Sequence, residues 1–248
     1  MQNSNDKAYQ KKVHFSIDDC LNSLRFLTEN QHQFTSIFDL DFYGKLREYH
    51  NKYNASFSLY LFEEKNGFQI QDVCTKYKRE FEENKDWLRF GFHGSERLES
   101  LSSEESFPVF CEAYKNTKNA LNNFASDQAW VDLIRLHRYQ ATSQEVAFLR
   151  EQGIKGLLTA HDDERISYDL TSDETAIVNC QGTFNKNDIK YQKTNLCVEF
   201  MSDELEELVC YEDKEELVIF AHEWKFKQKI NKLDKIMEWL EANSFTFL

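Results

Sequence analysis

The stretch VHFSIDDC, residues 13–20, is a short apolar, β-prone run that ends in two adjacent aspartates, Asp18 and Asp19. Later runs have the same form: WLRFGF before His93, VDLIRL before His137, GLLTA before His161 and Asp162, and ELVIFA before His222. In a parallel barrel or an open α/β sheet, the carboxyl ends of all strands lie on one face. The pattern therefore predicts that residues far apart in the sequence gather in a single pocket, as they do in an enzyme.

The segments around these runs predict an alternation of strands and helices. Strands are expected over residues 13–17, 55–62, 87–92, 130–136, 156–160 and 217–221, and helices over residues 20–28, 38–53, 75–83, 107–124, 202–211 and 226–240. A further helix is expected to open at Ser143, without a capping-box carboxylate, and to end at Gly153. Short connections of this kind are typical of parallel βα units. Residues 165–200 instead alternate in short runs around Gly182, which predicts an inserted β-ribbon or hairpin.

Composition and charge limit the class of protein. The chain has 248 residues with one proline and seven glycines, and no Ser-, Gly- or Pro-rich stretch separates its halves, so we expect one α/β domain over residues 1–248. The formal net charge of −13 opposes phosphate backbones and anionic membranes, so neither nucleic acid nor a membrane is expected as a partner. One local basic stripe is interpreted as the solvated face of the terminal helix, and comprises Lys225, Lys227, Lys229, Lys232 and Lys235.

The leader and the cysteines predict a cytoplasmic protein. The N-terminal sequence MQNSNDKAYQKK lacks an apolar segment of signal-peptide length, and no other run approaches a membrane span. The six cysteines include no C-x-x-C pair and are expected to be reduced thiols that serve mostly as packing groups. Their even number would suit three disulfides only in an exported protein.

The two adjacent aspartates have two interpretations. Like charges at short range raise one pKa unless a cation lies between them. A metal ion would resolve this conflict, because one carboxylate could bind the ion while the other acted as a general base. Alternatively, Asp18 or Asp19 caps a helix that starts at Cys20 and is favoured there by the helix dipole. The sequence alone leaves both interpretations open.

Two of the strand-end histidines are also candidates for chemistry. His93 stands where a strand gives way to the loop Gly94-Ser95, and a neutral imidazole there can ligate a divalent metal. His222 follows four apolar residues, and its use as a general acid would depend on a nearby carboxylate or metal. Each histidine by itself is equally compatible with an ordinary hydrogen-bonded residue.

The order of these pieces resembles the polysaccharide deacetylase superfamily, the NodB-like carbohydrate esterases of family 4. The matching segments are HFSIDD, ASFSLYLF, FGFH, IRLHRYQAT, GLLTAHDD and VIFAH, which extend from Val13 to His222. The family motifs run T-F-D-D-G, A-T-F-F-V, G-N-H-[ST]-x-x-H, F-R-x-P-x-G, an element near D-x-x-D-W, and a closing L-x-H. Each single match is loose, so the resemblance depends on order and spacing.

The resemblance implies a fold and an activity. Members of the family fold as a distorted (β/α)7 barrel and use a divalent metal ion, zinc or a related ion, to remove an acetyl group from an amino sugar. Asp18 would be the catalytic base, and Asp19 and His93 would bind the metal. His222 would be the catalytic acid. Independently of the resemblance, Trp224, close to His222 in the sequence, is the aromatic residue that we expect near the substrate. The absence of a signal peptide favours a small cytoplasmic carbohydrate, or a sugar-containing intermediate, over an extracellular polymer.

The sequence departs from the family pattern at one metal ligand. Arg97 stands where the family has a second metal-binding histidine, and an arginine cannot ligate a metal. His137 could fill this position from the neighbouring strand, as could Glu96 or Glu99 from the loop. His137 also lies near the position of the family arginine that orients the base, and Arg138 beside it could have that role or contact the substrate.

Further departures concern the rim of the expected pocket. His161, Asp162 and Asp163 fall near the motif that ends in tryptophan, without that tryptophan. Asp162 is expected to position Arg138 or a substrate hydroxyl. Cys20 replaces the glycine after the aspartates and is interpreted as a small packed residue.

Two other functions are compatible with the sequence. Arg97 favours a barrel that has lost its metal site and binds a carbohydrate or a protein partner, whereas the retained aspartates and histidines oppose that interpretation. A hydrolase that uses other chemistry on the same scaffold is the third candidate, because fold does not decide reaction. The sequence resembles neither a Gly-rich phosphate loop nor a G-x-S-x-G nucleophile elbow.

Overall fold

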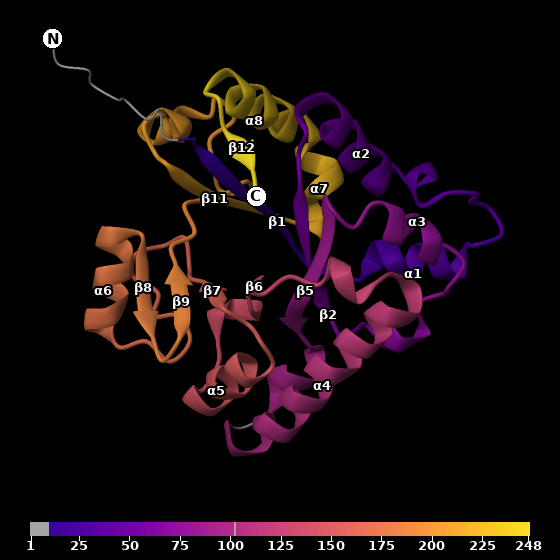
Figure 1. Ribbon diagram of the computed structural model, residues 1–248, viewed down its shortest axis with the longest axis horizontal. Coiled ribbons are helices and arrows are strands. Elements are labelled where there is room, and N and C mark those ends of the chain that lie inside the picture. The colour runs from indigo at the N-terminus through magenta and orange to yellow at the C-terminus, as the bar shows by residue number, and fades with distance from the viewer. Residues whose placement is uncertain (1–9, 102) are drawn as a thin grey trace, which may run out of the picture.

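The larger of two main sheets is built from parallel strands near both ends of the chain. The computed structural model describes residues 10–101 and 103–248 (Figure 1), so most of the polar leader lies outside the described residues. The strand order is β10 (Leu196–Cys197), β11 (Glu216–His222), β1 (Lys12–Cys20), β2 (Phe57–Phe62) and β5 (Leu88–Gly94), and β12 (Thr246–Phe247) also pairs with β1. All of these pairings are parallel.

A second sheet continues the arrangement. Its order is β6 (Leu133–Ile134), β7 (Gly156–Leu158), β9 (Ile189–Gln192) and β8 (Thr183–Lys186), and only the β8–β9 hairpin is antiparallel. A parallel bridge between Phe90 and Trp130 joins this side to β5. On the other side, Asn195 N donates to Val218 O of β11 at 2.9 Å. The protein therefore has a mixed α/β fold with a mostly parallel central sheet.

Helices cover the outside of the sheets (Figure 1). They are α1 (Asn22–Glu29), α2 (Asp41–Tyr53), α3 (Lys78–Glu83), α4 (Ser103–Phe124), α5 (Ser143–Glu151), α6 (Ser172–Gln181), α7 (Glu223–Phe226) and α8 (Ile230–Ala242). Short 3-10 helices lie at Ile37–Asp39, Ile70–Asp72, Glu96–Ser100, Asp127–Ala129, His137–Tyr139, Glu206–Tyr211 and Lys227–Lys229, and a small hairpin joins β3 (Glu64–Lys65) to β4 (Phe68–Gln69). None of the described helices is long and apolar enough to cross a membrane.

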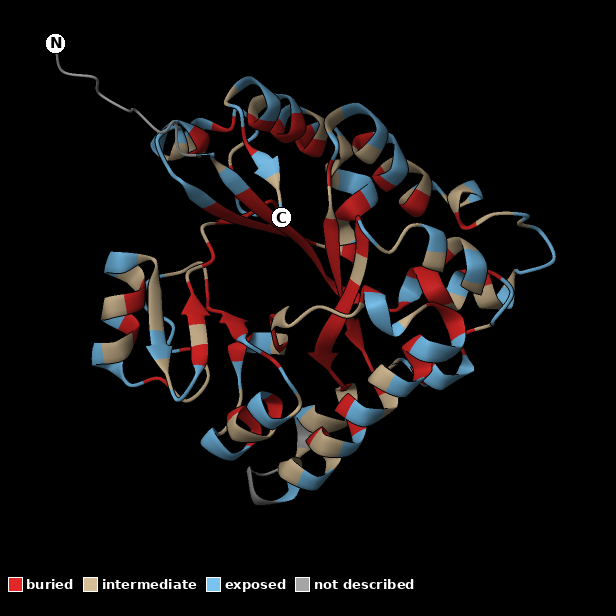
Figure 2. Ribbon diagram, in the orientation of Figure 1, coloured by how far each residue is buried: buried red, intermediate tan, exposed pale blue. Residues whose placement is uncertain are grey.

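Strand β1 is buried on both faces, and the two faces differ in chemistry. Every residue of β1 after Lys12 is buried, as the red strands of Figure 2 illustrate. Val13, Phe15 and Ile17 belong to the main hydrophobic core, where each buried side chain of this size contributes roughly 1.5–3 kcal/mol. Because strand side chains alternate, the even-numbered residues of β1 face the other way. Among them, His14, Ser16 and Asp18 are polar and buried, and Ser16 and Asp18 accept hydrogen bonds from the buried Arg135.

For residues 165–200, the structure confirms the predicted hairpin but also contains a helix that was not predicted. The expected hairpin is present as β8 and β9, but residues 172–181 form α6 instead of a strand. Thr171 caps this helix, and its partner Glu174 completes a capping box. Gly182 ends the helix in the left-handed region, with a φ of 82°. The Thr-x-x-Glu capping box and the terminal glycine favour a helix more strongly than the β-branched residues between them favour a strand.

Other element boundaries also differ from the sequence prediction. Helix α5 does have a capping box, formed by Thr142 and Glu145 one residue earlier than expected. Residues 202–211 contain turns and a 3-10 helix instead of an α-helix, and Leu205 lies in the left-handed region with a φ of 57°. The expected strand over 130–136 shortens to β6. In the terminal helix, Lys232 is buried rather than solvated, and its ammonium group donates to Met201 O.

Candidate metal centre

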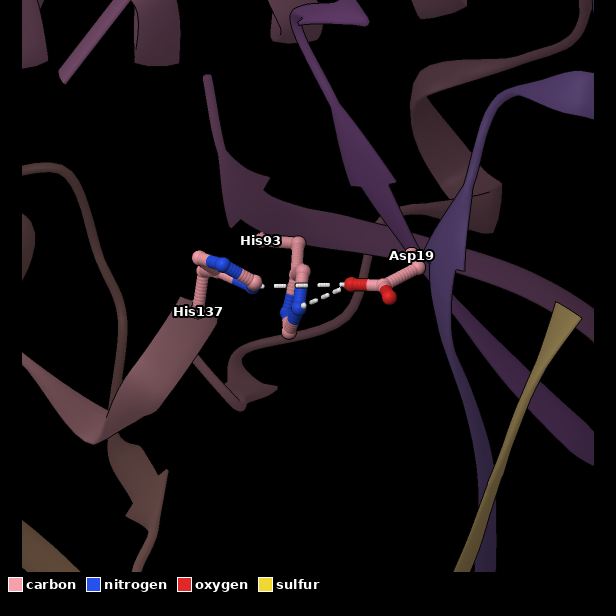
Figure 3. A group of neighbouring side chains, drawn as sticks. All are labelled: Asp19, His93 and His137. Atoms are coloured by element: carbon pink, nitrogen blue, oxygen red, sulfur yellow. Dashed lines mark hydrogen bonds and ion pairs between the residues drawn. The ribbon is translucent and has the colours of Figure 1, made fainter. Parts of the chain in front are cut away.

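Asp19, His93 and His137 meet at the carboxyl ends of three strands. Asp19 is near the end of β1, His93 is near the end of β5, and His137 follows β6. The Asp19 Oδ1 atom lies 3.2 Å from His93 Nε2 and 3.5 Å from His137 Nδ1 (Figure 3). One carboxylate and two imidazoles within this distance form a donor set that suits Zn²⁺ or a related divalent ion. We refer to these three residues as the Asp-His-His cluster.

Each member of the Asp-His-His cluster has a second contact that fixes its orientation. His93 Nδ1 lies 2.7 Å from Arg135 O, which leaves Nε2 directed at Asp19. His137 Nε2 lies 3.1 Å from the Glu99 carboxylate. Metal-binding histidines usually have such a carbonyl or carboxylate on the other ring nitrogen, because it sets the tautomer and the ring orientation.

Asp19 itself is held on its other oxygen. The indole Nε1 of Trp224 donates to Asp19 Oδ2 at 2.9 Å, and Lys65 Nζ lies 3.8 Å from the same oxygen. Burial by itself acts to raise the pKa of Asp19, but the hydrogen bonds from His137 and His93 outweigh burial and hold it well below the ordinary value. Asp19 is therefore a carboxylate at neutral pH, the form that binds a cation.

A distortion of β1 brings both aspartates to the same site. In a regular strand, adjacent side chains point to opposite faces, so Asp18 and Asp19 could not both face it. The pairing of β1 with β2 shifts register between Ile17 and Cys20, and Asp19 has a φ of 60°. A left-handed backbone costs a non-glycine residue roughly 1–2 kcal/mol, and such strain concentrates at functional sites. Arg138 and Tyr139, next to His137, have the same unusual conformation.

Asp18 forms a buried ion pair with a residue that the sequence analysis missed. Arg135 Nη1 lies 3.0 Å and 3.1 Å from the two carboxylate oxygens of Asp18, and both side chains are almost fully buried. Arg135 also donates to Thr194 Oγ1 through Nη2 at 3.0 Å. From the sequence, His137 or Arg138 was expected to orient Asp18. The arginine that contacts Asp18 in the structure is Arg135, two residues before His137 in the same apolar run.

His222 faces a second missed residue, Glu199. His222 Nδ1 lies 3.3 Å from Glu199 Oε2, and the backbone N–H of His222 donates to Glu199 Oε1 at 2.8 Å. Desolvation acts to lower the pKa of His222, but the facing Glu199 carboxylate and the nearby Asp18 outweigh it and raise the pKa above its ordinary value. The signal for Glu199 was present in the sequence, because LCV before Glu199 is another apolar run that ends in a titratable side chain.

The structure removes the alternative in which an aspartate caps the first helix. The Glu223 carboxylate accepts hydrogen bonds from the backbone N–H groups of Leu21, Asn22 and Ser23, at 3.2, 2.8 and 2.8 Å. Glu223 thus stabilises the N-terminus of α1 from a distant part of the chain. Neither aspartate is used for this purpose, and the sequence analysis did not identify Glu223.

Arg97 and the loop glutamates have separate partners. Arg97 binds the buried Glu63 through Nη2 at 2.9 Å and Nε at 3.2 Å, so it has a structural contact in place of a metal-binding one. Glu96 accepts a hydrogen bond from Asn66 N, away from the Asp-His-His cluster. Glu99 lies behind His137 and also binds Arg138 at 3.2 Å. Of the three candidates for the missing ligand, His137 is the one that lies within the cluster.

The residues that were expected at the rim of the pocket differ in their contacts. His161 stacks on the exposed Phe200, with ring centroids 5.3 Å apart. Asp162 accepts from Arg165 N at 2.8 Å and pairs with its guanidinium at 3.3 Å, so its partner is Arg165 and not Arg138. A substrate contact for Asp162 stays a prediction. Trp224 lies at the site as expected, and its side chain is half exposed.

A cavity of about 400 Å³ opens beside the Asp-His-His cluster. His93 and His137 form part of its wall, together with the ring of Tyr168 and the side chain of Ile166. A volume of this size can accommodate a small organic ligand. Two of the three candidate metal ligands therefore line a cavity that can hold a small molecule.

Comparison with known proteins supports a distant relation in fold. No protein-family model and no curated protein matches the sequence. Among solved structures, the protein is similar to a peptidoglycan N-acetylglucosamine deacetylase in complex with 4-naphthalen-1-yl-N-oxidanyl-benzamide. The TM-score is 0.52 and the identity is 13%, over 97% of this chain and 86% of that chain. The match extends over nearly the whole chain, and at this identity it is a similarity of fold.

Proposed function

We propose that this protein is a metal-dependent hydrolase that removes an N-acetyl or similar acyl group from an amino sugar or a sugar-containing intermediate. The observation that carries the proposal is the Asp-His-His cluster, which includes the neighbour of Asp18 in the chain and has two of its residues in the wall of a cavity. The fold similarity to a deacetylase agrees with this reaction class. A small cytoplasmic carbohydrate is the proposed substrate.

We also propose that the two sheets form one distorted (β/α)7 barrel. The order β11, β1, β2 and β5 continues through the Phe90–Trp130 bridge into β6, β7 and β9. The chain then passes from β9 into β10, which pairs with β11. If β9 and β10 are taken as successive parts of one barrel strand, the strand positions close after seven.

The residues of the Asp-His-His cluster fit the proposed metal. Bound there, a divalent ion would supply a Lewis acid for the acyl carbonyl and a more acidic water molecule. Asp19, His93 and His137 would hold it, with Trp224 and Glu99 keeping two of these ligands in orientation. Zinc is the proposed ion because the set combines two imidazoles with one carboxylate.

Asp18 and His222 would move the protons. Asp18 would accept the proton of the attacking water while Arg135 holds its carboxylate in place. His222 would donate a proton to the departing amine, and Glu199 would position its ring. The raised pKa of His222 supports this role, because more of the imidazole is protonated near neutral pH.

Two exposed aromatic side chains offer surfaces for a sugar ring. Trp224 and Phe200 are both exposed, and each packs against a histidine at this end of the protein. Exposed aromatic faces suit stacking on the apolar face of a sugar. We propose that Trp224, Arg138 and Asp162 contact the substrate, with Trp224 nearest to His222.

The binding-only alternative loses its main support. It depended on Arg97 at the position of a metal ligand, but His137 completes a three-ligand cluster, and Arg97 binds Glu63. A binding-only protein would have no chemical need for the Asp-His-His cluster beside the Asp18 carboxylate. The metal-dependent hydrolase is therefore the function that the geometry supports best.

Chelation and reconstitution test the proposed function. Acetate release from small N-acetylated amino sugars is measured before and after EDTA, and again after addition of zinc, cobalt or manganese. We expect chelation to abolish turnover and one of the metals to restore it. Asp19→Asn removes a proposed metal ligand and should lower the rate by about 100-fold or more, whereas His32→Gln, at an exposed histidine outside the cluster, should not change it. Turnover that survives complete chelation would rule out the metal mechanism.

A further inference from the structure

A second group of potential metal ligands lies between β10 and β11. Cys197 is in β10, Glu199 follows two residues later, and His222 ends β11. Val198 and Glu199 lie in a turn directly after β10, and the Glu199 carboxylate contacts Cys197 Sγ at 3.0 Å. The pairing of Cys197 with Phe220 and the hydrogen bond from His222 N to Glu199 Oε1 then bring His222 to the same place.

The three side chains have the spacing of a set of metal ligands. Cys197 Sγ lies 3.0 Å from Glu199 Oε2, which lies 3.3 Å from His222 Nδ1, and all three atoms are within 4.8 Å of one another. With bond lengths of about 2.0–2.3 Å, a tetrahedral zinc ion places neighbouring ligand atoms roughly 3.3–3.8 Å apart. Small side-chain rotations would therefore suffice to bring all three atoms to a single ion.

One of the three atoms lacks an aligned partner. His222 Nδ1 is shielded from solvent and makes no hydrogen bond of acceptable geometry within the part of the chain that the structure describes, although Glu199 Oε2 is near. A buried ring nitrogen without an aligned hydrogen-bond partner is unfavourable, because it has lost its contact with water. A cation between Nδ1, the carboxylate and the sulfur would satisfy this atom.

We propose that Cys197, Glu199 and His222 form a second cation site that binds Zn²⁺ or another thiophilic divalent ion. A sulfur ligand distinguishes it from the Asp-His-His cluster, which has only nitrogen and oxygen donors. Thiolate favours zinc, cobalt and cadmium over magnesium, calcium and manganese. When the ion binds, it takes the place of the thiol proton, which leaves to solvent.

Occupation of this site has a consequence that rests on the proposed function. An ion on His222 Nδ1 excludes the proton from that nitrogen, and it also takes the Glu199 carboxylate that faces the ring. The imidazole could then no longer act as a cationic acid. The protein should be activated by the first equivalent of zinc and inhibited by excess zinc, whereas excess manganese, which binds thiolate weakly, should inhibit far less.

The sulfur gives the site a signature that does not depend on activity. Metal-free protein is titrated with Co²⁺, and the near-ultraviolet charge-transfer band of a cobalt–thiolate bond is followed. We expect the band to grow with one equivalent of cobalt in the wild-type protein. The band should disappear, with loss of that equivalent, in both Cys197→Ser and Cys197→Ala, whereas Cys180→Ser, at an exposed cysteine elsewhere, should retain it. His137→Gln should keep the band while losing the other equivalent.

The outcomes separate this inference from the proposed function. No cobalt–thiolate band in the wild-type protein, or a band that survives loss of Cys197, would overturn the second site even if chelation abolishes hydrolysis. A Cys197-dependent band in a protein that hydrolyses no amide would support the site and reject the proposed function. The proposed inhibition by zinc is then tested by the ratio of hydrolysis rates with and without excess zinc, which is measured in each variant and compared with the wild-type ratio. An unchanged ratio in Cys197→Ser would reject the inhibitory role.

Discussion

Arg135 connects several buried groups of the candidate site. It is 1% exposed, and it binds Ser16 and Asp18 of β1 and also Thr194, which follows β9. Burial acts to lower its pKa, but the Asp18 carboxylate raises it above the ordinary value, so the ion pair stays charged. Its backbone carbonyl also fixes His93. One side chain and one carbonyl therefore connect the proposed base to the proposed metal ligands.

Removal of Arg135 should destabilise the protein strongly. Arg135→Met leaves the Asp18 carboxylate buried without a partner, which costs about 3–5 kcal/mol of unfolding free energy. The double variant Asp18→Asn with Arg135→Met should recover a large part of that loss, because no unpaired charge remains. Urea unfolding of the single and double variants measures both effects. A single variant within about 0.5 kcal/mol of the wild type would contradict this account, since surface substitutions have effects of that size.

Two substitutions separate the two contacts of Trp224. Trp224→Phe keeps an aromatic face but loses the indole N–H that binds Asp19, so it should weaken metal affinity by roughly 10–100-fold. Trp224→Ala also loses the face and should raise KM more than it lowers kcat. Metal affinity by competition with a chelator and steady-state kinetics test the two roles. Equal metal affinity in Trp224→Phe and the wild-type protein would show that the indole N–H contact does not affect metal binding by Asp19.

The His222–Glu199 pair predicts a change in pH dependence. Because the pKa of His222 is raised, the protonated acid persists above the ordinary histidine range, and loss of its proton should produce the alkaline limb of the kcat/KM profile. Glu199→Gln removes the carboxylate that opposes desolvation, so the alkaline limb should move to lower pH. The profile is measured with one equivalent of metal. An alkaline limb at the same pH in both proteins would mean that His222 is not the acid.

At the scale of elements, the Glu223 contact joins α7 to α1. Its carboxylate accepts from three consecutive backbone N–H groups at the start of α1, where the helix dipole also favours a negative charge. Glu223→Ala should therefore lower the unfolding free energy by about 2–4 kcal/mol, as expected for several hydrogen bonds to a charged acceptor. Thr171→Ala, which removes a single side-chain cap from α6, is the matched comparison and should cost about 1 kcal/mol. Equal losses would argue against Glu223 as a multiple cap.

The elements that sequence predicted well are those with strong periodicity and clear ends. Strands β1, β2, β5 and β11 follow apolar runs, and α2, α4 and α8 follow helical stripes. The errors lie where local signals conflict. In α6 the caps at Thr171 and Gly182 outweigh β-branched residues, and at Leu205 a left-handed backbone interrupts a helical pattern. Neither outcome follows from hydrophobic spacing.

The candidate site was predictable only in part. Asp19, His93 and His137 could be inferred, because each follows an apolar run and the ends of parallel strands converge. Their partners could not be inferred with the same rule. Arg135 lies within such a run instead of at its end, and the contact of Trp224 with Asp19 depends on the bulge in β1. Register shifts and left-handed residues decide these contacts, and neither leaves a simple pattern in the sequence.

At the scale of the whole molecule, the fold brings chemistry from most of the chain to one end. The residues of the Asp-His-His cluster span positions 19–137, and Glu199 and His222 lie beyond them in sequence. The strands are parallel except for the hairpins β8–β9 and β3–β4. Because the ends of parallel strands lie together, histidines and carboxylates that are far apart in the sequence can form one cluster. No local sequence motif needs to contain all of them.

A crystal structure of the zinc-loaded protein, with anomalous scattering recorded at the zinc edge, tests the central claim most directly. At one equivalent of zinc, we expect an anomalous peak within about 2.0–2.2 Å of Asp19 Oδ1, His93 Nε2 and His137 Nδ1. A zinc ion bound at full occupancy elsewhere, with no ion between these three atoms, would contradict the proposed metal centre. It would also contradict the hydrolysis that depends on that centre.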